Sequence, residues 1–193
     1  MNRPMQTLDY AILGLVARAP STGYEVSARL RNPVGYYWAE SHGGVYPSLR
    51  RLVDARWVSV RSAPGPGPYG KKIYSVTRTG RRALGRWAAS PPADAPPRDE
   101  LVLKTSSLWA ADRGSAIAML AAEGERWERA RKEYAGIVRE LRASEPAVGS
   151  ARWFGLQTAL RGVGFARGRR DWCRQVARSL TESEQVTNSS RRA

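Results

Sequence analysis

Residues 45–80 have the sequence VYPSLRRLVDARWVSVRSAPGPGPYGKKIYSVTRTG, and this stretch decides the fold of the N-terminal half. Its first part predicts a helix after Ser41, because apolar residues recur there at helical spacing: Val45, Leu49, Leu52 and Val53. Residues 57–62 and 71–76 are short, β-branched or aromatic and partly alternating, which is typical of strands. The segment between them is rich in glycine and proline and predicts a loop.

Further helices are predicted on both sides of this stretch. Residues 7–18 form a first helix behind Thr7 as a cap, and a Thr22-x-x-Glu25 capping box starts a second helix that ends near Arg31. A fourth helix over residues 77–89 is expected to bury Gly80, Leu84, Trp87 and Ala88. Three helices followed by a hairpin form the pattern of a winged helix-turn-helix, with the hairpin as its wing. We therefore predict a DNA-binding domain of this kind in residues 1–90.

A proline-rich segment marks the end of this domain. Four prolines lie between Ser90 and Arg98, which forbids a continuous helix and predicts an extended linker over residues 91–98. Beyond it the pattern predicts a short helix near residues 99–109, a long helix capped by Asp112 that ends near Ala143, and a last helix over residues 146–180. Residues 181–193 lack apolar periodicity and are expected to be a disordered tail. The predicted fold class is mainly α, of the α+β type.

The two long helices are expected to form an antiparallel hairpin, a helical dimerisation domain spanning residues 99–180. Apolar residues of the first long helix recur alternately at intervals of three and four residues. Gly124 and Arg131 are the two exceptions in this seam. Pairs at i,i+4, Glu125 with Arg129 and Glu128 with Lys132, are expected on its surface. Because the seam is wider than one partner covers, a second copy of the chain is expected there, although packing against the N-terminal domain is an alternative. The candidate dimerisation residues are Ile117, Leu120, Trp127, Tyr134, Leu156, Leu160 and Trp172.

The charge of the chain points to a polyanionic partner. The formal net charge is +15, and residues 1–90 hold 14 Lys/Arg against 4 Asp/Glu, so the excess is concentrated in the first half. All but four of the basic residues are Arg, whose planar guanidinium suits phosphate and guanine contacts. No stretch is long and apolar enough for a membrane helix or signal peptide, so a cytoplasmic, nucleoid-associated location without membrane contact is expected.

Five sequence blocks are each weak alone but occur in a suitable order and spacing. They are Leu8–Leu15 (LDYAILGL), Ser21–Glu25 (STGYE), Val45–Leu52 (VYPSLRRL), Lys72–Gly80 (KIYSVTRTG) and Arg98–Leu101 (RDEL) with Lys104. Together these blocks resemble those of the PadR family of bacterial transcriptional regulators. The resemblance also accounts for Pro47, which members of the family commonly carry after the tyrosine of this helix. It implies a two-fold dimer and, in some relatives, a small aromatic effector.

The helix after Ser41 is the predicted recognition helix. If Val45, Leu49 and Leu52 face the core, the opposite face is expected to present Tyr46 and Arg50, flanked by Ser48 and Arg51. Arg50 can bind guanine O6/N7 in a major groove, and Tyr46 a phosphate or a thymine methyl. In the wing, Arg61, Lys71 and Lys72 are expected to hold phosphates, with Tyr69 near the minor groove. Half-buried packing of Tyr46 and a merely solvated position for the arginines remain alternatives.

Other chemistry finds little support in the sequence. A binding site for an aromatic effector would be lined by Trp109, Trp127, Trp153 and Phe154. Tryptophans at helical spacing, however, more often belong to the core of a dimer. The single histidine, His42, lies in a helix-capping segment, and no metal-ligand cluster or phosphate-binding glycine loop is visible, so neither an enzyme nor a cofactor is expected. Cys173 lies among arginines and would sense redox state only if they lowered its pKa.

The sequence therefore predicts a homodimeric repressor of a pseudopalindromic, double-stranded DNA operator. Two copies of the recognition helix would enter major grooves about 34 Å apart. The alternatives are a basic protein that coats nucleic acid or chromosomes without sequence preference, and an adaptor whose winged helix binds another protein.

Overall fold

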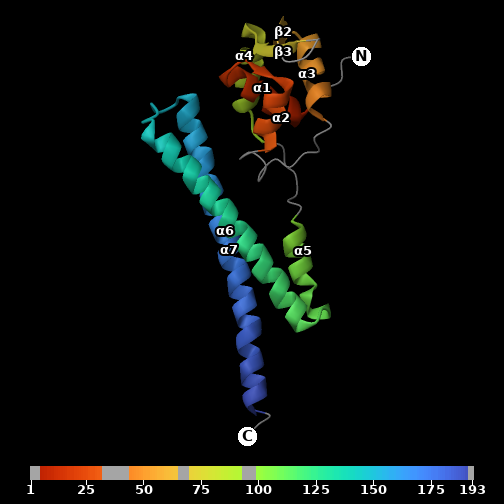
Figure 1. The fold of residues 1–193 in the computed structure, drawn as a ribbon, viewed down its shortest axis with the longest axis vertical. Coiled ribbons are helices and arrows are strands. Elements are labelled where there is room, and N and C mark those ends of the chain that lie inside the picture. The colour runs from red at the N-terminus through yellow and green to blue at the C-terminus, as the bar shows by residue number, and fades with distance from the viewer. Residues whose placement is uncertain (1–4, 32–43, 65–69, 93–98, 191–193) are drawn as a thin grey trace. The chain divides into compact units, whose positions relative to one another are not determined.

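The computed structural model describes residues 5–31, 44–64, 70–92 and 99–190, and the chain divides into two compact units, residues 1–94 and 95–193. The first unit has the element order α1 (Thr7–Arg18), β1 (Ser21–Thr22), α2 (Gly23–Arg31), α3 (Val45–Asp54), β2 (Val58–Ala63), β3 (Lys71–Val76) and α4 (Arg78–Ala88) (Figure 1). This is the predicted winged helix-turn-helix.

Helix α1 provides the centre of the first unit's core. Its buried side chains recur at helical spacing and meet the inner faces of α2, α3 and β2. The buried apolar residues are Leu8, Ile12, Leu13, Val16, Val26, Val45, Leu49, Leu52 and Val58. The N-cap of α1 is Gln6 rather than Thr7, because the backbone N–H of Gln6 donates to Oδ2 of Asp9 at 2.8 Å.

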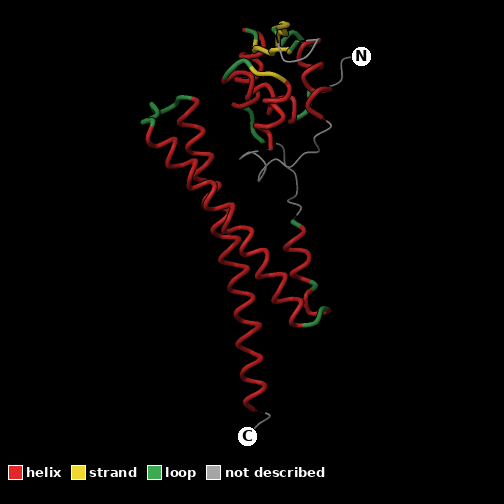
Figure 2. The backbone as a smooth tube through the Cα atoms, in the orientation of Figure 1, coloured by secondary structure: helices red, strands yellow, loops and turns green. Residues whose placement is uncertain are grey.

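The strands form a three-stranded antiparallel sheet in the order β1-β3-β2, and the described strands all belong to the first unit (Figure 2). Val60 pairs with Tyr74, and Ala63 with Lys71. Gly70 precedes β3 with a φ of 63°, and a Cβ there would lie 2.6 Å from the carbonyl oxygen of Ala63. The hairpin therefore needs glycine at this position. The sequence did not predict β1, because two residues are too few to show alternation.

Helix α4 is fixed to the start of β2. The hydroxyl of Thr77 accepts from the backbone N–H of Gly80 at 3.0 Å, as an N-cap does. Gly80 lies so close to Trp57 that a Cβ would be 2.1 Å from its carbonyl oxygen. The predicted burial of Trp87 and Ala88 is wrong, since both are exposed. The Trp87 ring nevertheless stacks on Tyr10, with ring centroids 4.7 Å apart.

The second unit is helical throughout its described residues. It contains α5 (Glu100–Ser106), the 3-10 turn η3 (Leu108–Ala110), α6 (Arg113–Ala143) and α7 (Ala151–Ser190). Asp112 caps α6 as predicted, with Oδ1 accepting from the N–H of Ser115 at 2.9 Å. The last helix starts at Ala151 rather than Pro146, because Ser150 supplies the cap hydroxyl for the N–H of Trp153. It continues past the expected end at Leu180 to Ser190, and no proline or glycine interrupts that stretch.

Helices α6 and α7 form the predicted antiparallel hairpin (Figure 1). Four of the candidate dimerisation residues, Leu120, Trp127, Tyr134 and Leu156, are buried within the single chain. They therefore belong to the core of one hairpin, whereas Ile117, Leu160 and Trp172 keep part of their surface. Gly124 lies against α7, since a Cβ there would meet the Cβ of Cys173 at 3.7 Å. Gly164 and Gly168 have nothing within 4 Å of such an atom, so the hairpin itself does not require them.

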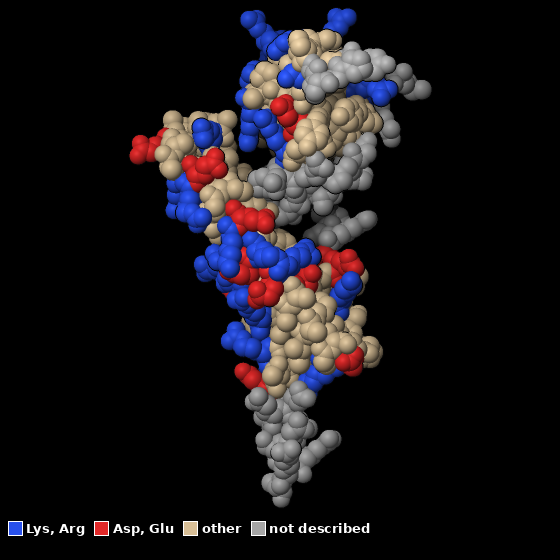
Figure 3. Space-filling view, in the orientation of Figure 1, with Lys and Arg blue, Asp and Glu red and all other residues tan. Residues whose placement is uncertain are grey.

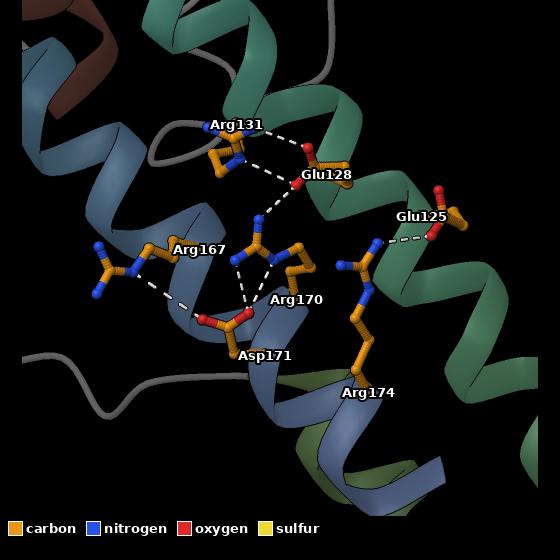
Figure 4. A network of polar contacts seen from close by, with 7 residues as sticks. All are labelled: Glu125, Glu128, Arg131, Arg167, Arg170, Asp171 and Arg174. Atoms are coloured by element: carbon orange, nitrogen blue, oxygen red, sulfur yellow. Dashed lines mark hydrogen bonds and ion pairs between the residues drawn. The ribbon is translucent and has the colours of Figure 1, made fainter. Parts of the chain in front are cut away.

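A polar network crosses the hairpin (Figure 4). Glu128 accepts from Arg131 of its own helix and from Arg170 of α7, at 2.8 and 2.6 Å, and these guanidiniums hold its pKa well below its usual range. Glu125 pairs with Arg174 of α7 at 2.8 Å. The predicted i,i+4 partners are therefore wrong, because guanidiniums of the neighbouring helix and Arg131, at i,i+3, take their place. Arg131 interrupts the apolar seam because it binds Glu128.

The entry to this unit is fixed by Asp99, the N-cap of α5, which forms a forked ion pair with Arg169 of α7. Hydrogen bonds from Arg169 lower the pKa of Asp99 to about 2. The Arg169 guanidinium also lies 4.9 Å from the ring centre of Trp127. Helix α5 is therefore held at the middle of the hairpin. In the described residues, no helix is long and apolar enough to cross a membrane.

Candidate nucleic-acid interface

Helix α3 presents a narrow exposed face opposite its apolar face. Tyr46, Pro47 and Arg50 are exposed, while Val45, Leu49 and Leu52 are buried. Tyr46 as a whole residue is 58% exposed, so it is more exposed than half-buried packing would leave it. The helix begins at Val45, which places Pro47 in the first turn, where its missing N–H has no intrahelical partner to lose.

Two residues predicted to flank this face are turned inward. Ser48 is completely buried, and the guanidinium of Arg51 donates to Ser48 Oγ and to Asp9 Oδ1, each at 2.7 Å. Their assignment to an outward-facing site is therefore wrong. Ser48 follows Val45 by three residues and precedes Leu52 by four, so helical geometry places it on the buried face. Asp9, a fully buried carboxylate on α1, is the partner that the sequence reasoning missed.

The signal for this ion pair was present in the sequence. Asp9 follows Leu8 and precedes Ile12 by three residues, so it lies within the apolar stripe of α1. An acid in such a position needs a cationic partner, because an unpaired buried charge is costly. Arg51 provides that partner from α3. The pair thereby fixes α3 to the beginning of α1.

The start of α2 lies beside α3 and is held by the predicted capping box. The N–H of Thr22 donates to Glu25 Oε2 at 2.7 Å, and the N–H of Glu25 donates to Thr22 Oγ1 at 3.2 Å. These hydrogen bonds lower the pKa of Glu25. Next to the box, Gly23 faces Tyr46, and a Cβ there would come within 2.7 Å of the tyrosine ring. Glycine therefore permits the recognition-helix tyrosine to lie against α2.

The wing carries exposed basic side chains at its outer end. Arg61, Lys71 and Lys72 are exposed, and the register places Ser62 opposite Lys72. The hairpin carries Val60 and Arg61 on opposite faces of β2, because side chains alternate along a strand. Tyr69, the remaining predicted wing residue, lies outside the described residues.

A hollow of about 660 Å³ joins the recognition helix to the wing. It brings together four of the predicted DNA-contacting residues, Tyr46, Arg50, Lys71 and Lys72. Tyr24 and Tyr74 also line it, and sequence reasoning did not single them out. Tyr24 lies within the capping-box segment and Tyr74 within a predicted strand, so both were interpreted as structural residues. Arg61 is not part of the lining.

The surface around these residues is basic. The visible face of the first unit shows several Lys and Arg side chains and few acids (Figure 3). Within the described residues of the unit, Arg50, Arg61, Lys71 and Lys72 are all exposed, whereas Asp9 is buried against Arg51 and only two acids, Glu25 and Asp54, are exposed. Such a surface attracts a phosphate backbone and releases its counterions. The arrangement suits contact with double-stranded nucleic acid.

The predicted effector residues are not brought together. Trp127 is buried in the middle of the hairpin beside Phe165, Trp109 is 87% exposed on η3, and Trp153 contacts Phe154 near the start of α7. Trp127 lies about 20 Å along α6 from the end nearest Trp109. One chain therefore does not form a pocket from all four.

Other sequence candidates carry no chemistry here. Cys173 is buried, and burial raises the pKa of its thiol, which opposes the redox-sensing idea. His42 lies outside the described residues. No group of three metal-ligating side chains occurs in the part of the chain that the structure describes.

Comparison with known proteins gives two family matches that cover the two units. The family described as "Transcriptional regulator PadR-like family" matches residues 12–86, and "Virulence activator alpha C-term" matches residues 97–181. The chain is 28% identical over 153 residues to the negative transcriptional regulator PadR of Bacillus subtilis, covering 78% of this chain and 84% of that protein. It is 29% identical over 185 residues to a probable transcriptional regulator of Mycobacterium tuberculosis, covering 91% and 98%.

The same fold occurs in solved structures. The structure of this chain is similar to the crystal structure of Bacillus subtilis PadR in complex with operator DNA. The TM-score is 0.79, the sequence identity is 22%, and the match covers 92% of this chain and 99% of that one. The structure is also similar to the same protein in complex with p-coumaric acid, with a TM-score of 0.69, 20% identity and coverage of 91% and 99%.

Proposed function

Because this chain belongs to the PadR-like family of transcriptional regulators, we propose that it acts as a homodimeric repressor on a pseudopalindromic operator. Members of the family bind DNA and are not enzymes. Residues 1–90 would read the DNA, residues 91–98 would connect the domains and residues 99–180 would form the dimer. The protein would act in the cytoplasm, on the nucleoid.

The observation that carries this proposal is the exposed face of α3. Tyr46 and Arg50 point away from a core that buries Val45, Leu49 and Leu52, so their polar atoms are free to reach base edges. Arg50 would bind a guanine, and Tyr46 a phosphate or thymine methyl. Arg61, Lys71 and Lys72 of the wing would hold phosphates and supply affinity that depends on salt.

A homodimer is supported by apolar surface that one chain leaves uncovered. Val102, Leu103 and Trp109 are all more than half exposed on α5 and η3, where the surface in Figure 3 is largely uncharged. Val148 and Phe154 are likewise exposed at the turn between α6 and α7. The two groups lie at opposite ends of α6, and exposed apolar side chains of this size are typical of an interface between protein chains. A second copy of the chain would bury them.

Release by a small aromatic acid is part of the proposal. Its support is the solved complex of Bacillus subtilis PadR with p-coumaric acid. In this chain the ligand would change the angle between subunits or compete with DNA. Because the four predicted effector residues do not meet within one chain, a site made from them would need residues of both subunits.

A gel-shift titration of the full chain tests the proposal. Labelled DNA from its own promoter region is compared with random DNA of equal length, at low and physiological salt. We expect promoter DNA to bind at least tenfold more tightly and light scattering to give a dimer. Equal affinity for both DNAs, falling together as salt rises, would instead favour the non-specific binding that a net charge of +15 permits.

A further inference from the structure

Helix α4 carries a second basic surface, and the proposed function does not use it. The sequence of the helix, RTGRRALGRWA, contains four arginines and no acid. At about 3.6 residues per turn, its buried residues Gly80 and Ala83 lie on one face, and the arginines lie on the opposite face. These four exposed arginines, called the α4 arginine face below, are Arg78, Arg81, Arg82 and Arg86.

A fifth arginine lies beside the start of this face. The carbonyl oxygen of Arg56 accepts from Oγ1 of Thr77, the N-cap of α4, at 2.8 Å, and Arg56 is exposed. The sequence contains no Asp or Glu between Asp54 and Asp94. The exposed acids among the described residues of the first unit, Glu25 and Asp54, belong to α2 and α3. Helix α4 and the turn beside it therefore carry positive charge alone.

The arginines of α4 differ from those of the second unit, which bind acids. Arg131 and Arg170 both pair with Glu128. Arg174 pairs with Glu125. Among the described residues, no member of the α4 arginine face forms an ion pair. Like charges at i,i+4 destabilise a helix, so stability of the fold does not explain this cluster. An anionic partner would relieve the repulsion.

The α4 arginine face is separate from the predicted DNA-contacting surface. Helices α3 and α4 pack on different sides of α1 (Figure 1). Arg51 joins α3 to Asp9 of α1, whereas Trp87 of α4 stacks on Tyr10. Lys72 of the wing lies roughly 13 Å along β3 from the end of the strand that leads into α4. Within this unit, a duplex held by α3 and the wing would therefore leave the α4 arginine face uncovered.

We propose that the α4 arginine face binds the phosphate backbone of a second DNA duplex, so that the protein bridges two duplexes. Guanidiniums bind phosphate oxygens in a forked geometry, which favours a phosphate backbone as the partner. Gly85 lies among these arginines and has nothing within 4 Å of an added Cβ, so a backbone can approach the helix closely there. Contacts of this kind do not read sequence. The bridging rests on the proposed function for its first duplex, which α3 would hold.

Bridging is measured by the capture of a second duplex. Promoter DNA on beads is saturated with the full chain, and a fluorescent duplex of random sequence is then added at physiological salt. The α4 variant combines Arg78→Gln, Arg82→Gln and Arg86→Gln. A control variant has the same change of charge at exposed positions of the second unit, Arg139→Gln, Arg142→Gln and Arg152→Gln. We expect wild type and the control variant to capture the second duplex, and the α4 variant to capture at least about fivefold less.

Two further measurements show that the α4 variant is folded and still binds the promoter. Its thermal midpoint should be no lower than that of wild type, because repulsion within α4 is removed. Its affinity for promoter DNA in a gel shift should change less than about twofold, because α3 is untouched.

Three outcomes would overturn the proposal. The first is the absence of second-duplex capture by wild type, and the second is equal capture by wild type and the α4 variant. The third is capture of labelled polyglutamate in place of DNA, which would indicate an acidic protein as the partner. If wild type did not bind the immobilised promoter at all, the proposed function would fail together with bridging. That result is distinguishable, because no protein would then be retained on the beads.

Discussion

Arg51 of the recognition helix donates to the buried carboxylate of Asp9 on α1, with Nη2 2.7 Å and Nε 3.2 Å from Oδ1. The two residues are far apart in sequence, and the pair joins α3, the predicted recognition helix, to α1 at the centre of the core. It thereby fixes which side chains of α3 face outward, because rotation of the helix would separate the two charges.

Removing the Asp9 charge should destabilise the first unit. Asp9→Asn is expected to lower the free energy of unfolding by about 2 kcal/mol, since it deprives a mostly buried guanidinium of its carboxylate. Asp54→Asn, at an exposed position of α3, the helix that carries Arg51, should change the free energy of unfolding by less than about 0.5 kcal/mol. Urea unfolding followed by circular dichroism measures both. Equal midpoints for Asp9→Asn and wild type would contradict the role assigned to the pair.

Arg50 and Lys72 should differ in what they contribute to DNA binding. Arg50→Ala is expected to weaken promoter binding by roughly 1 to 3 kcal/mol and to affect random DNA less, because Arg50 would contact a base. Lys72→Ala should weaken binding to promoter DNA and to random DNA similarly. It should also reduce the slope of log affinity against log salt concentration by about 1. Fluorescence anisotropy at several salt concentrations gives both quantities. Identical behaviour of the two variants would argue against base reading by Arg50.

Two glycines of α4 should respond oppositely to the same substitution. Gly80→Ala places a methyl 2.1 Å from the Trp57 carbonyl oxygen, so about 1 to 3 kcal/mol of stability should be lost. Gly85 has nothing within 4 Å of an added Cβ, and Gly85→Ala should stabilise by about 0.5 to 1 kcal/mol. Thermal unfolding of the matched pair measures the difference. A stabilised Gly80→Ala would mean that α4 does not lie so close to β2.

The pair of Asp99 and Arg169 should make stability depend on acid pH. The folded-state pKa of Asp99 is about 2, below its ordinary 3.8, so its contribution is complete above pH 4 and is lost as pH falls towards 2. That shift corresponds to roughly 2 kcal/mol at most, and partial exposure of both groups reduces it to about 1 kcal/mol. The free energies of unfolding of wild type and Asp99→Asn, measured in urea between pH 5 and pH 2.5, should therefore converge as the pH falls. A constant difference across this range would contradict the assignment.

Helix positions were the most predictable part of the fold. The caps Thr22 and Asp112 have the hydrogen bonds expected of them, and α1, α2 and α6 lie within a residue of their predicted bounds. These features are local, since a cap and an apolar stripe are defined by neighbours in sequence. For the same reason the order of helices and strands in the winged helix-turn-helix could be derived from the sequence alone.

Long-range relationships were predicted less well. Sequence reasoning assigned Arg51 to DNA, because nothing local to α3 shows that Asp9 will lie beneath it. Trp87 was expected to be buried, yet it is exposed, since apolar character alone does not supply a neighbouring element. Glu128 binds Arg170 across the hairpin, which spacing along α6 alone does not reveal.

The attachment of Asp99 to Arg169 has a mechanical consequence. Asp99 is the first described residue after the proline-rich linker, and its carboxylate is clamped to the middle of α7 rather than to either end. One carboxylate therefore has two tasks, since it caps the first turn of α5 and also joins that short helix to α7. Loss of this single side chain would free the start of α5 from both constraints at once.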